Sequence, residues 1–225
     1  MMDEFEISRF EREFFTGRES FTYSGSGELG GKAHGLAKMG DVLGREVRPL
    51  FEPAISVAIP RLTVLTTEFF DLFMRENDLY DIALSDRRDE VKAHAFLRAS
   101  LPVGLAGDLR AIAQQVHTPL AVRSSSLLED AMFEPFASVY ATKMVPNNLP
   151  DADSRFQKLS EAVKFIYAST FFKSARDYMK VASHSIEDEK MAVIVQDIIG
   201  SRFGDRYYPQ ISGAMSSFNF YPFGI

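Results

Sequence analysis

The stretch YSGSGELGGKAHGLAKMG, residues 23–40, carries six glycines and a lysine ahead of a run with helical spacing. Glycine at this density permits tight turns and close backbone approach, which is typical of loops that surround a phosphate. A lysine behind a glycine turn, at a helix start, is chemically suited to an anion. The alternative is a loop with a solvated lysine, and this stretch alone does not decide between the two.

Two familiar phosphate-binding patterns fail on this stretch. The glycines of residues 25–30 satisfy the G-x-G-x-x-G spacing, but that fingerprint needs a strong apolar strand before it, and residues 21–24 are short and polar. The P-loop pattern requires glycine where Ser26 stands and a hydroxyl where Ala33 stands, so no side chain there can hold magnesium. The stretch therefore forms either a different kind of anion site or no anion site.

Composition limits the class of protein. The chain has 225 residues, 46% of them hydrophobic and 25% charged, as in an ordinary globular protein. A net charge of -6, without a long basic tract, argues against general nucleic-acid binding. The absence of cysteine excludes disulfides and thiolate metal sites. No signal-peptide pattern begins the chain and no apolar run of roughly 18 residues occurs, so a cytoplasmic protein without membrane contact is expected.

Hydrophobic periodicity predicts both helices and strands. Helices are expected at about residues 5–15, 32–43, 67–74, 86–99, 105–116 and from 153 or 154 onward. Strands are expected at residues 55–59, 62–65, 120–123, 138–145 and 191–199. Gly44 is expected to end the second helix, and Thr66 or Thr67 to cap the third. The pattern is that of an α/β or α+β protein.

A second stretch, AVRSSSLLED at residues 121–130, also suits a phosphate. Here an arginine at the end of a short strand is followed by three hydroxyl side chains. A guanidinium fork with neutral donors beside it suits a polyphosphate. The alternative is an arginine paired with Glu129 or Asp130 within a turn.

Seven segments, taken in order, carry a resemblance to a known family. They are GGKAHGLAKM, IPRLTVLTTEFFDLFM, AVRSSSLLED, EPFASVYATKMV, IYASTFFKSARDYM, KMAVIVQDII and ISGAMSSFNFYP. From about Gly30 onward the chain resembles the N-terminal nucleotide-binding domain of the phosphoenolpyruvate synthase and pyruvate phosphate dikinase family. The resemblance implies an α+β, ATP-grasp-like fold with mixed or antiparallel sheets and flanking helices, incomplete at the C-terminus. We expect an acidic segment at residues 1–20 and a partial nucleotide-binding domain of two subdomains at residues 21–225.

The resemblance also implies particular site residues. Those placed at the ATP phosphates are Gly30, Gly31, Lys32, Arg123, Ser124 and Ser138. Arg123 is implied to be catalytic, because it matches the arginine that holds the terminal phosphates where charge shifts during transfer. Val195 and Gln196 match the adenine side of the site, where backbone groups read the base.

The chain departs from the family pattern at two positions. Ser138 replaces a glycine of the loop that covers the phosphates, and its β-carbon narrows the room for backbone approach. Tyr221 stands before Pro222, where the family has a carboxylate. The Mg²⁺ ligands are expected beyond residue 225, so no metal ligand is assigned here. His184 superficially resembles a carrier histidine but is interpreted as a connector residue.

The leading interpretation is the ATP-binding part of a dikinase that uses ATP and Mg²⁺. The parent would transfer a phosphoryl group to a carrier histidine, then to pyruvate or another acceptor through further domains. The apolar ending SSFNFYPFGI suggests a chain cut before its fold is complete, and this chain alone is expected to be inactive. The alternative is a non-catalytic nucleotide-sensing or scaffolding module. A dinucleotide oxidoreductase is a distant third possibility.

Overall fold

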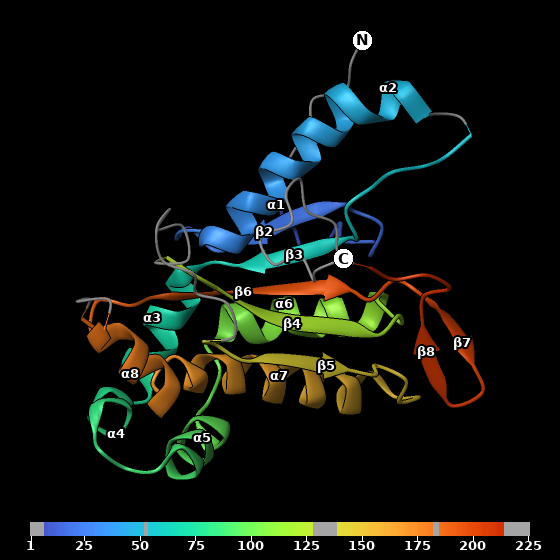
Figure 1. The fold of residues 1–225 in the computed structure, drawn as a ribbon. Helices are drawn as coiled ribbons and strands as arrows, with labels where there is room; N and C mark the ends of the chain where they lie inside the picture. Colours follow the sequence, from blue (N-terminus) through green and yellow to red (C-terminus); the bar gives the residue numbers. More distant parts are fainter. Residues whose placement is uncertain (1–6, 52–53, 128–138, 182–184, 214–225) are drawn as a thin grey trace, which may run out of the picture.

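The computed structural model describes residues 7–51, 54–127, 139–181 and 185–213, and its centre is a six-stranded sheet (Figure 1). The strand order is β1-β2-β3-β6-β4-β5. The strands are β1 (Ser8–Arg9), β2 (Phe21–Ser24), β3 (Leu62–Leu65), β4 (Leu120–Ser126), β5 (Thr142–Val145) and β6 (Met191–Asp197). Neighbouring β1, β2 and β3 are parallel, whereas β6 runs antiparallel to both β3 and β4. The sheet is therefore mixed, which confirms the predicted α+β class with flanking helices.

Strand β6 lies in the middle of the sheet because its sequence suits burial on both faces. MAVIVQ, residues 191–196, is buried along its whole length. A continuous apolar run rich in β-branched residues is typical of a central strand. Alternate residues of β6 face two separate apolar clusters: Val193 and Val195 lie in one, and Ala192 and Ile194 in the other.

Most helices cover one face of the sheet, where the larger core lies (Figure 1). These helices are α3 (Thr67–Glu76), α4 (Tyr80–Leu84), α5 (Asp89–Arg98), α6 (Val103–Gln115), α7 (Ala152–Ser169) and α8 (Lys173–Val181). In α7, Leu159, Val163 and Ile166 recur at helical spacing and are fully buried. The helix begins after Asp151, whose side chain accepts a hydrogen bond from the Ser154 backbone N–H at 2.7 Å.

Helix α1 (Gly31–Val42) lies alone on the opposite face (Figure 1). Its Ala33 packs with Phe21, Val64 and Ile194 in the smaller cluster. The helix continues through a π-helical turn, Leu43–Val47, into α2 (Arg48–Phe51). A two-stranded hairpin of β7 (Ser201–Phe203) and β8 (Arg206–Tyr208) follows β6. None of the described helices combines the length and apolar character that a membrane span requires.

Two of the predicted elements are absent. Residues 5–15 were expected to form a helix, but the described part contains β1 and a turn, and the Phe10 N–H donates to the Tyr23 carbonyl at 2.7 Å. Here the backbone of β1 pairs with β2, and the apolar residues of this segment fit a helix poorly. Residues 55–59 form no strand, because both edges of β3 are already occupied by β2 and β6.

The boundaries of five further elements differ from the prediction. The helix from residue 32 does not end at Gly44, since the π turn carries the backbone past it. The long helix is capped by Asp151 rather than by residue 153 or 154. The strand predicted at 138–145 covers only Thr142–Val145, with residue 138 outside the described chain. The strands predicted at 120–123 and 191–199 run from 120 to 126 and from 191 to 197.

Candidate functional site

The glycine loop between β2 and α1 packs against the start of α3. A β-carbon at Gly25 would lie 2.1 Å from the Thr66 hydroxyl oxygen, and one at Gly27 would lie 2.5 Å from the Glu68 backbone nitrogen. Both distances are shorter than a carbon atom tolerates, so only glycine fits. These two glycines therefore permit close packing between protein segments.

The backbone amides of this loop are also engaged by α3. Ser26 N–H donates to the Glu68 carboxylate at 2.6 Å, and Glu28 N–H donates to the Thr67 hydroxyl at 3.0 Å. Gly27 N–H donates to the Thr66 hydroxyl at 3.2 Å. Amides committed in this way do not form a phosphate cradle, in agreement with the failure of both sequence patterns. An anion near this loop would therefore have to be bound by groups other than these three amides.

Gly30 brings α1 against the end of β4. Its φ angle is +74°, and a β-carbon there would lie 1.9 Å from the Ser125 carbonyl oxygen. The Ser125 hydroxyl donates to the Leu29 carbonyl at 2.9 Å and accepts from the Ala33 N–H at 3.1 Å. A positive φ angle and close backbone approach both require glycine. Gly31 has no positive φ angle and is the first residue of the helix.

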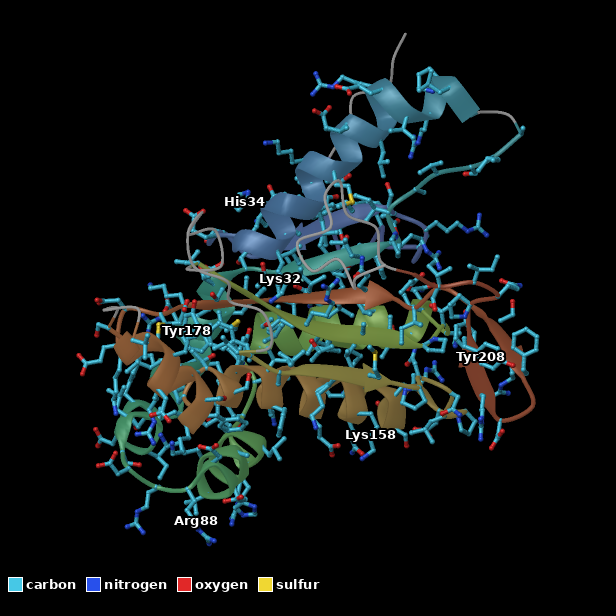
Figure 2. The ribbon with its side chains drawn as sticks, viewed as in Figure 1. Lys32, His34, Arg88, Lys158, Tyr178 and Tyr208 are labelled. Atoms are coloured by element: carbon cyan, nitrogen blue, oxygen red, sulfur yellow. The ribbon has the colours of Figure 1, made fainter. Side chains whose placement is uncertain are left out.

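Lys32 projects from the first turn of α1 to β4 (Figure 2). Its Nζ donates to the Ser124 hydroxyl oxygen at 3.1 Å, and Ser124 is itself buried. Strand β5 pairs with β4 only from Leu120 to Arg123, so the contact lies just past the end of that pairing. The structure therefore brings together two of the predicted phosphate-binding residues, Lys32 and Ser124. His34, two residues on, is exposed.

Arg123 lies on the face of the sheet that α1 covers. It is paired with Ile194, a member of the smaller cluster, so both side chains share that face. Its Nη1 donates to the Gln196 side-chain oxygen at 3.0 Å. No carboxylate of the described residues forms an ion pair with Arg123. The alternative of an arginine paired with Glu129 or Asp130 is not tested, because both residues lie outside the described chain. Val195 points into the larger core and is not joined to Arg123.

A scan against protein families matches residues 26–222 to the family described as pyruvate phosphate dikinase, AMP/ATP-binding domain. This chain belongs to that family. The match covers most of the 225 residues and agrees with the resemblance noted from the seven sequence segments. The mixed sheet with helices on both faces is consistent with an ATP-grasp-like domain. A search of curated proteins found no match.

Several residues singled out in this AMP/ATP-binding domain lie outside the described chain. They are Glu129, Asp130, Ser138, His184, Tyr221 and Pro222. Their predicted roles stay predictions. Sequence reasoning also overlooked the three α3 residues that engage the glycine loop. No local signal marks them, because the contact joins segments about 40 residues apart.

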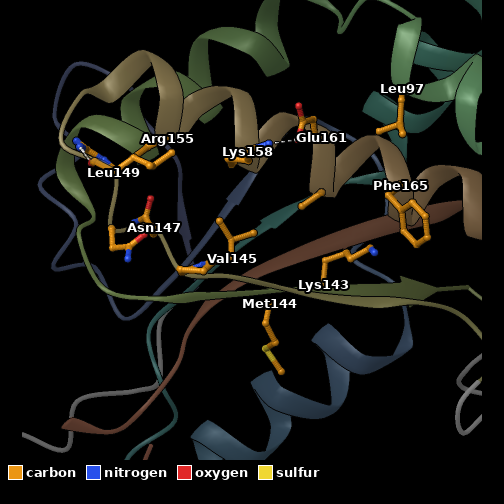
Figure 3. Close-up of a pocket in the computed structure, with 13 residues that line it drawn as sticks. Leu97, Lys143, Met144, Val145, Asn147, Leu149, Arg155, Lys158, Glu161 and Phe165 are labelled. Carbon is orange, nitrogen blue, oxygen red and sulfur yellow. Dashed lines mark hydrogen bonds and ion pairs between the residues drawn. The ribbon is translucent and has the colours of Figure 1, made fainter. Parts of the chain in front are cut away.

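Two cavities that are lined by described residues lie away from Lys32 and Arg123. One, of about 650 Å³, lies where β4 begins and β6 ends, and His117, Pro119, Met144 and Ile198 contribute to its wall. Another, of about 600 Å³, lies between β5 and α7, beside Lys143 and Phe165 (Figure 3). The side chains and contacts, rather than the cavity volumes, therefore define the candidate phosphate site.

The described residues do not supply an evident magnesium site. Among residues 7–51, 54–127, 139–181 and 185–213, no group of three or more His, Asp or Glu side chains is placed to hold a metal ion. Mg²⁺ is usually bound by carboxylates together with substrate phosphates. The described residues therefore do not form a ligand set for the Mg²⁺ that the family resemblance implies.

Proposed function

We propose that this domain binds ATP with its phosphates between Lys32 and Arg123, as the nucleotide-binding part of a dikinase. The finer proposal is that the parent transfers a phosphoryl group to a carrier histidine and then to pyruvate or another acceptor. Family membership supports nucleotide binding, whereas the acceptor is inferred from the resemblance alone. The proposed phosphate-binding set comprises Gly30, Gly31, Lys32, Arg123, Ser124 and Ser138.

The observation that carries the proposal is the state of Arg123. Its guanidinium is half-buried and, within the described part of the chain, is held by a neutral amide rather than by a carboxylate. A buried positive charge is normally paired. An arginine held in place without an opposite charge is suited to an anionic ligand, since charge-assisted bonds from a guanidinium to phosphate are strong. Ser124, the next residue, accepts from Lys32, which places a second cation close by.

The proposed site extends along β4 and β6. Strands rise about 3.3 Å per residue, so the start of β4 and Ser124 are separated by roughly 13 Å. That length suits ATP with its base near Gln196 and Ile198 and its phosphates near Ser124. The cavity lined by Ile198 adjoins the proposed base end. We retain Val195 and Gln196 as the adenine side of the site.

Calorimetric titration of the chain with ATP tests the proposal. Arg123→Ala should weaken ATP binding by about 10- to 100-fold, corresponding to roughly 1.5–3 kcal/mol for a charge-assisted hydrogen bond. Arg123→Lys should recover only part of the loss, because the planar fork is absent. Arg98→Ala, at an exposed arginine of α5, is the matched control and should bind ATP like the wild type. Unchanged affinity in Arg123→Ala would remove the assignment.

Lys32 provides a second arm of the same titration. Lys32→Ala should weaken ATP more than AMP, because only ATP presents the β- and γ-phosphates. Added salt should reduce the preference for ATP, since part of the affinity is electrostatic. Equal losses for ATP and AMP would place Lys32 away from the phosphates and would favour a plain loop.

The second candidate function is a non-catalytic nucleotide sensor, favoured by Ser138 and by Tyr221 in place of a carboxylate. Incubation with labelled ATP and Mg²⁺, followed by detection of phosphoprotein, addresses the catalytic part. We expect this chain alone to remain unlabelled, whereas stoichiometric labelling of His184 would show that the histidine was misjudged. The two subdomains within residues 21–225, the separate segment 1–20 and a cytoplasmic location stay predictions.

A further inference from the structure

Gln196 and Arg123 meet across two neighbouring strands. Gln196 on β6 is paired with Ala121 on β4, so Arg123, two residues further along, is its diagonal neighbour on the same face. Long side chains at such positions can reach one another, and here the two are joined at 3.0 Å. The contact is thus fixed by the register of the two central strands.

The environment of Gln196 commits its amide to this contact. The residue is only 6% exposed, and its directly opposed partners, Ala121 and Leu62, have apolar side chains. A buried amide without a hydrogen bond is unfavourable. Because a guanidinium only donates, the amide must present its oxygen to Arg123. The orientation of the Gln196 side chain follows from the chemistry of its partner.

Other arginines of the chain are held in a different way. Arg12 and Arg61 each form an ion pair with an aspartate, at 2.8 and 2.5 Å. Arg155 is buried and donates to several backbone carbonyls. Arg123 donates once, to the neutral Gln196, which leaves its charge and most of its donors uncommitted among the described residues. This arrangement orients a guanidinium without neutralising it.

We propose that Gln196 is a positioning residue that holds Arg123 ready for the ATP phosphates, in addition to its place on the adenine side. This inference rests on the proposed function. A fixed guanidinium loses less conformational freedom when it binds phosphate. A neutral partner is required, because a carboxylate in the same position would compete with the phosphates for the same donors. The Gln196 side chain therefore acts on the phosphates through Arg123, and only its backbone is assigned to the adenine side.

The test compares two substitutions with a matched control. Gln196→Glu keeps the size but adds a competing charge, and Gln196→Met keeps the length but removes the acceptor. Gln114→Glu makes the same chemical change at an exposed position of α6. Calorimetry with ATP, inorganic tripolyphosphate and adenosine separates the phosphate end from the base end. Thermal denaturation of each variant verifies that it is folded.

We expect Gln196→Glu to weaken ATP and tripolyphosphate by about tenfold or more, as for the loss of one charge-assisted contact. Gln196→Met should weaken both by a smaller factor, because the charge of Arg123 remains but is no longer oriented. Adenosine binding should change by less than roughly twofold in each variant, as should all binding to Gln114→Glu. If Gln196→Glu binds tripolyphosphate normally, the positioning role is overturned.

The outcomes separate this inference from the proposed function. A folded wild-type chain that binds neither ATP nor tripolyphosphate would overturn both. A chain that binds ATP and depends on Arg123, but whose Gln196 variants lose adenosine and retain tripolyphosphate, would leave the proposed function intact. In that case Gln196 would read the base only. If both variants lose thermal stability and lose affinity for all three ligands to a similar extent, Gln196 has a purely structural role.

Discussion

At the scale of single residues, the glycines that attract attention in YSGSGELGGKAHG serve contacts within the protein. Gly25 and Gly27 admit the start of α3, and Gly30 admits the backbone of β4. The proposed anion-binding chemistry lies instead in the side chains of Lys32, which follows these glycines, and of Arg123 on β4. Within the stretch, the glycines thus supply shape and Lys32 supplies charge.

Gly30→Ala should strongly destabilise the fold. The new methyl group would clash with the Ser125 carbonyl oxygen. The alanine would also have to adopt the φ angle of +74° that Gly30 has. Left-handed backbone alone costs about 1–3 kcal/mol for a residue with a side chain, and the clash adds to it. Gly35→Ala is the control, since nothing lies within 4 Å of its β-carbon. That substitution should stabilise α1 by about 0.5–1 kcal/mol.

Urea denaturation of both variants measures the difference. Opposite signs for Gly30→Ala and Gly35→Ala are the expected result. Equal, small effects at the two positions would mean that α1 does not need to approach β4 as closely as the structure shows. Gly31, by contrast, needs no special backbone conformation, although the sequence alone made it as strong a candidate as Gly30.

Sequence reasoning at this scale named Lys32, Arg123 and also their partners Ser124 and Gln196, but it did not predict the contacts that join them. Lys32 and Arg123 belong to recognisable segments, so the resemblance placed them. The glutamine oxygen that meets Arg123 depends on the register between β4 and β6, which no local pattern encodes. The one available hint was a lone amide at the end of an apolar strand.

At the scale of elements, strong local periodicity was a good predictor and weak periodicity was not. Strand β6 and helices α3 and α7 were predicted because their apolar residues match one structure closely. The segment 55–59 has a strand-like composition but forms no strand, and both edges of the following strand β3 are already paired with β2 and β6. Gly44 carries a helix-ending signal, but the backbone continues past it in a π turn. In both cases the local signal alone predicted the wrong structure.

Helix α5 is joined to its neighbours by a buried lysine. Lys92 is fully buried, and its Nζ donates to the carbonyls of Ala83 and Phe171 at 2.6 and 3.1 Å. Lys92→Met removes both hydrogen bonds and should destabilise the fold by about 1–3 kcal/mol. Lys158→Met on α7, where the lysine is exposed, is the control and should change stability by less than about 0.5 kcal/mol. An equally stable Lys92→Met variant would contradict the role of the buried hydrogen bonds.

The same lysine should give the stability a pH dependence. Burial, and then the nearby Arg176 charge, lower the pKa of Lys92 below its ordinary value of 10.5. Between the lowered pKa and 10.5 the unfolded chain holds the proton more often than the folded chain, so raising the pH favours folding. Urea denaturation across that interval should show the stability gap between wild type and Lys92→Met widening as the pH rises. A constant gap would mean that the pKa is not lowered.

At the scale of the whole molecule, β6 connects two cores that lie on opposite faces of the sheet. A chain of net charge -6 presents its two candidate phosphate-binding cations beside this strand, at the side covered by α1. Nucleotide binding at this side would therefore stabilise the smaller cluster directly. The larger core would be stabilised as well if β6 couples the unfolding of the two faces.

We expect the two cores to unfold together. Met191→Ala removes a side chain from the larger core and Ile194→Ala removes one from the smaller cluster, and both residues are fully buried on β6. Each substitution should lower the free energy of unfolding by about 2–5 kcal/mol. Because the same strand carries both side chains, each should also accelerate amide hydrogen exchange in α1 and α7 alike. Val181→Ala, at an exposed residue of α8, is the control.

Hydrogen exchange also gives the result that would contradict this coupling. If α1 and the smaller cluster formed a separate unit, Ile194→Ala would accelerate exchange in α1 only and leave α7 as in the wild type. Strand β6 is hydrogen-bonded on one side to β3 and on the other to β4, and β4 contacts both α1 and α7. Loosening either face of β6 must disturb both ladders, and their loss exposes both cores. A single transition therefore follows from the position of β6 in the sheet.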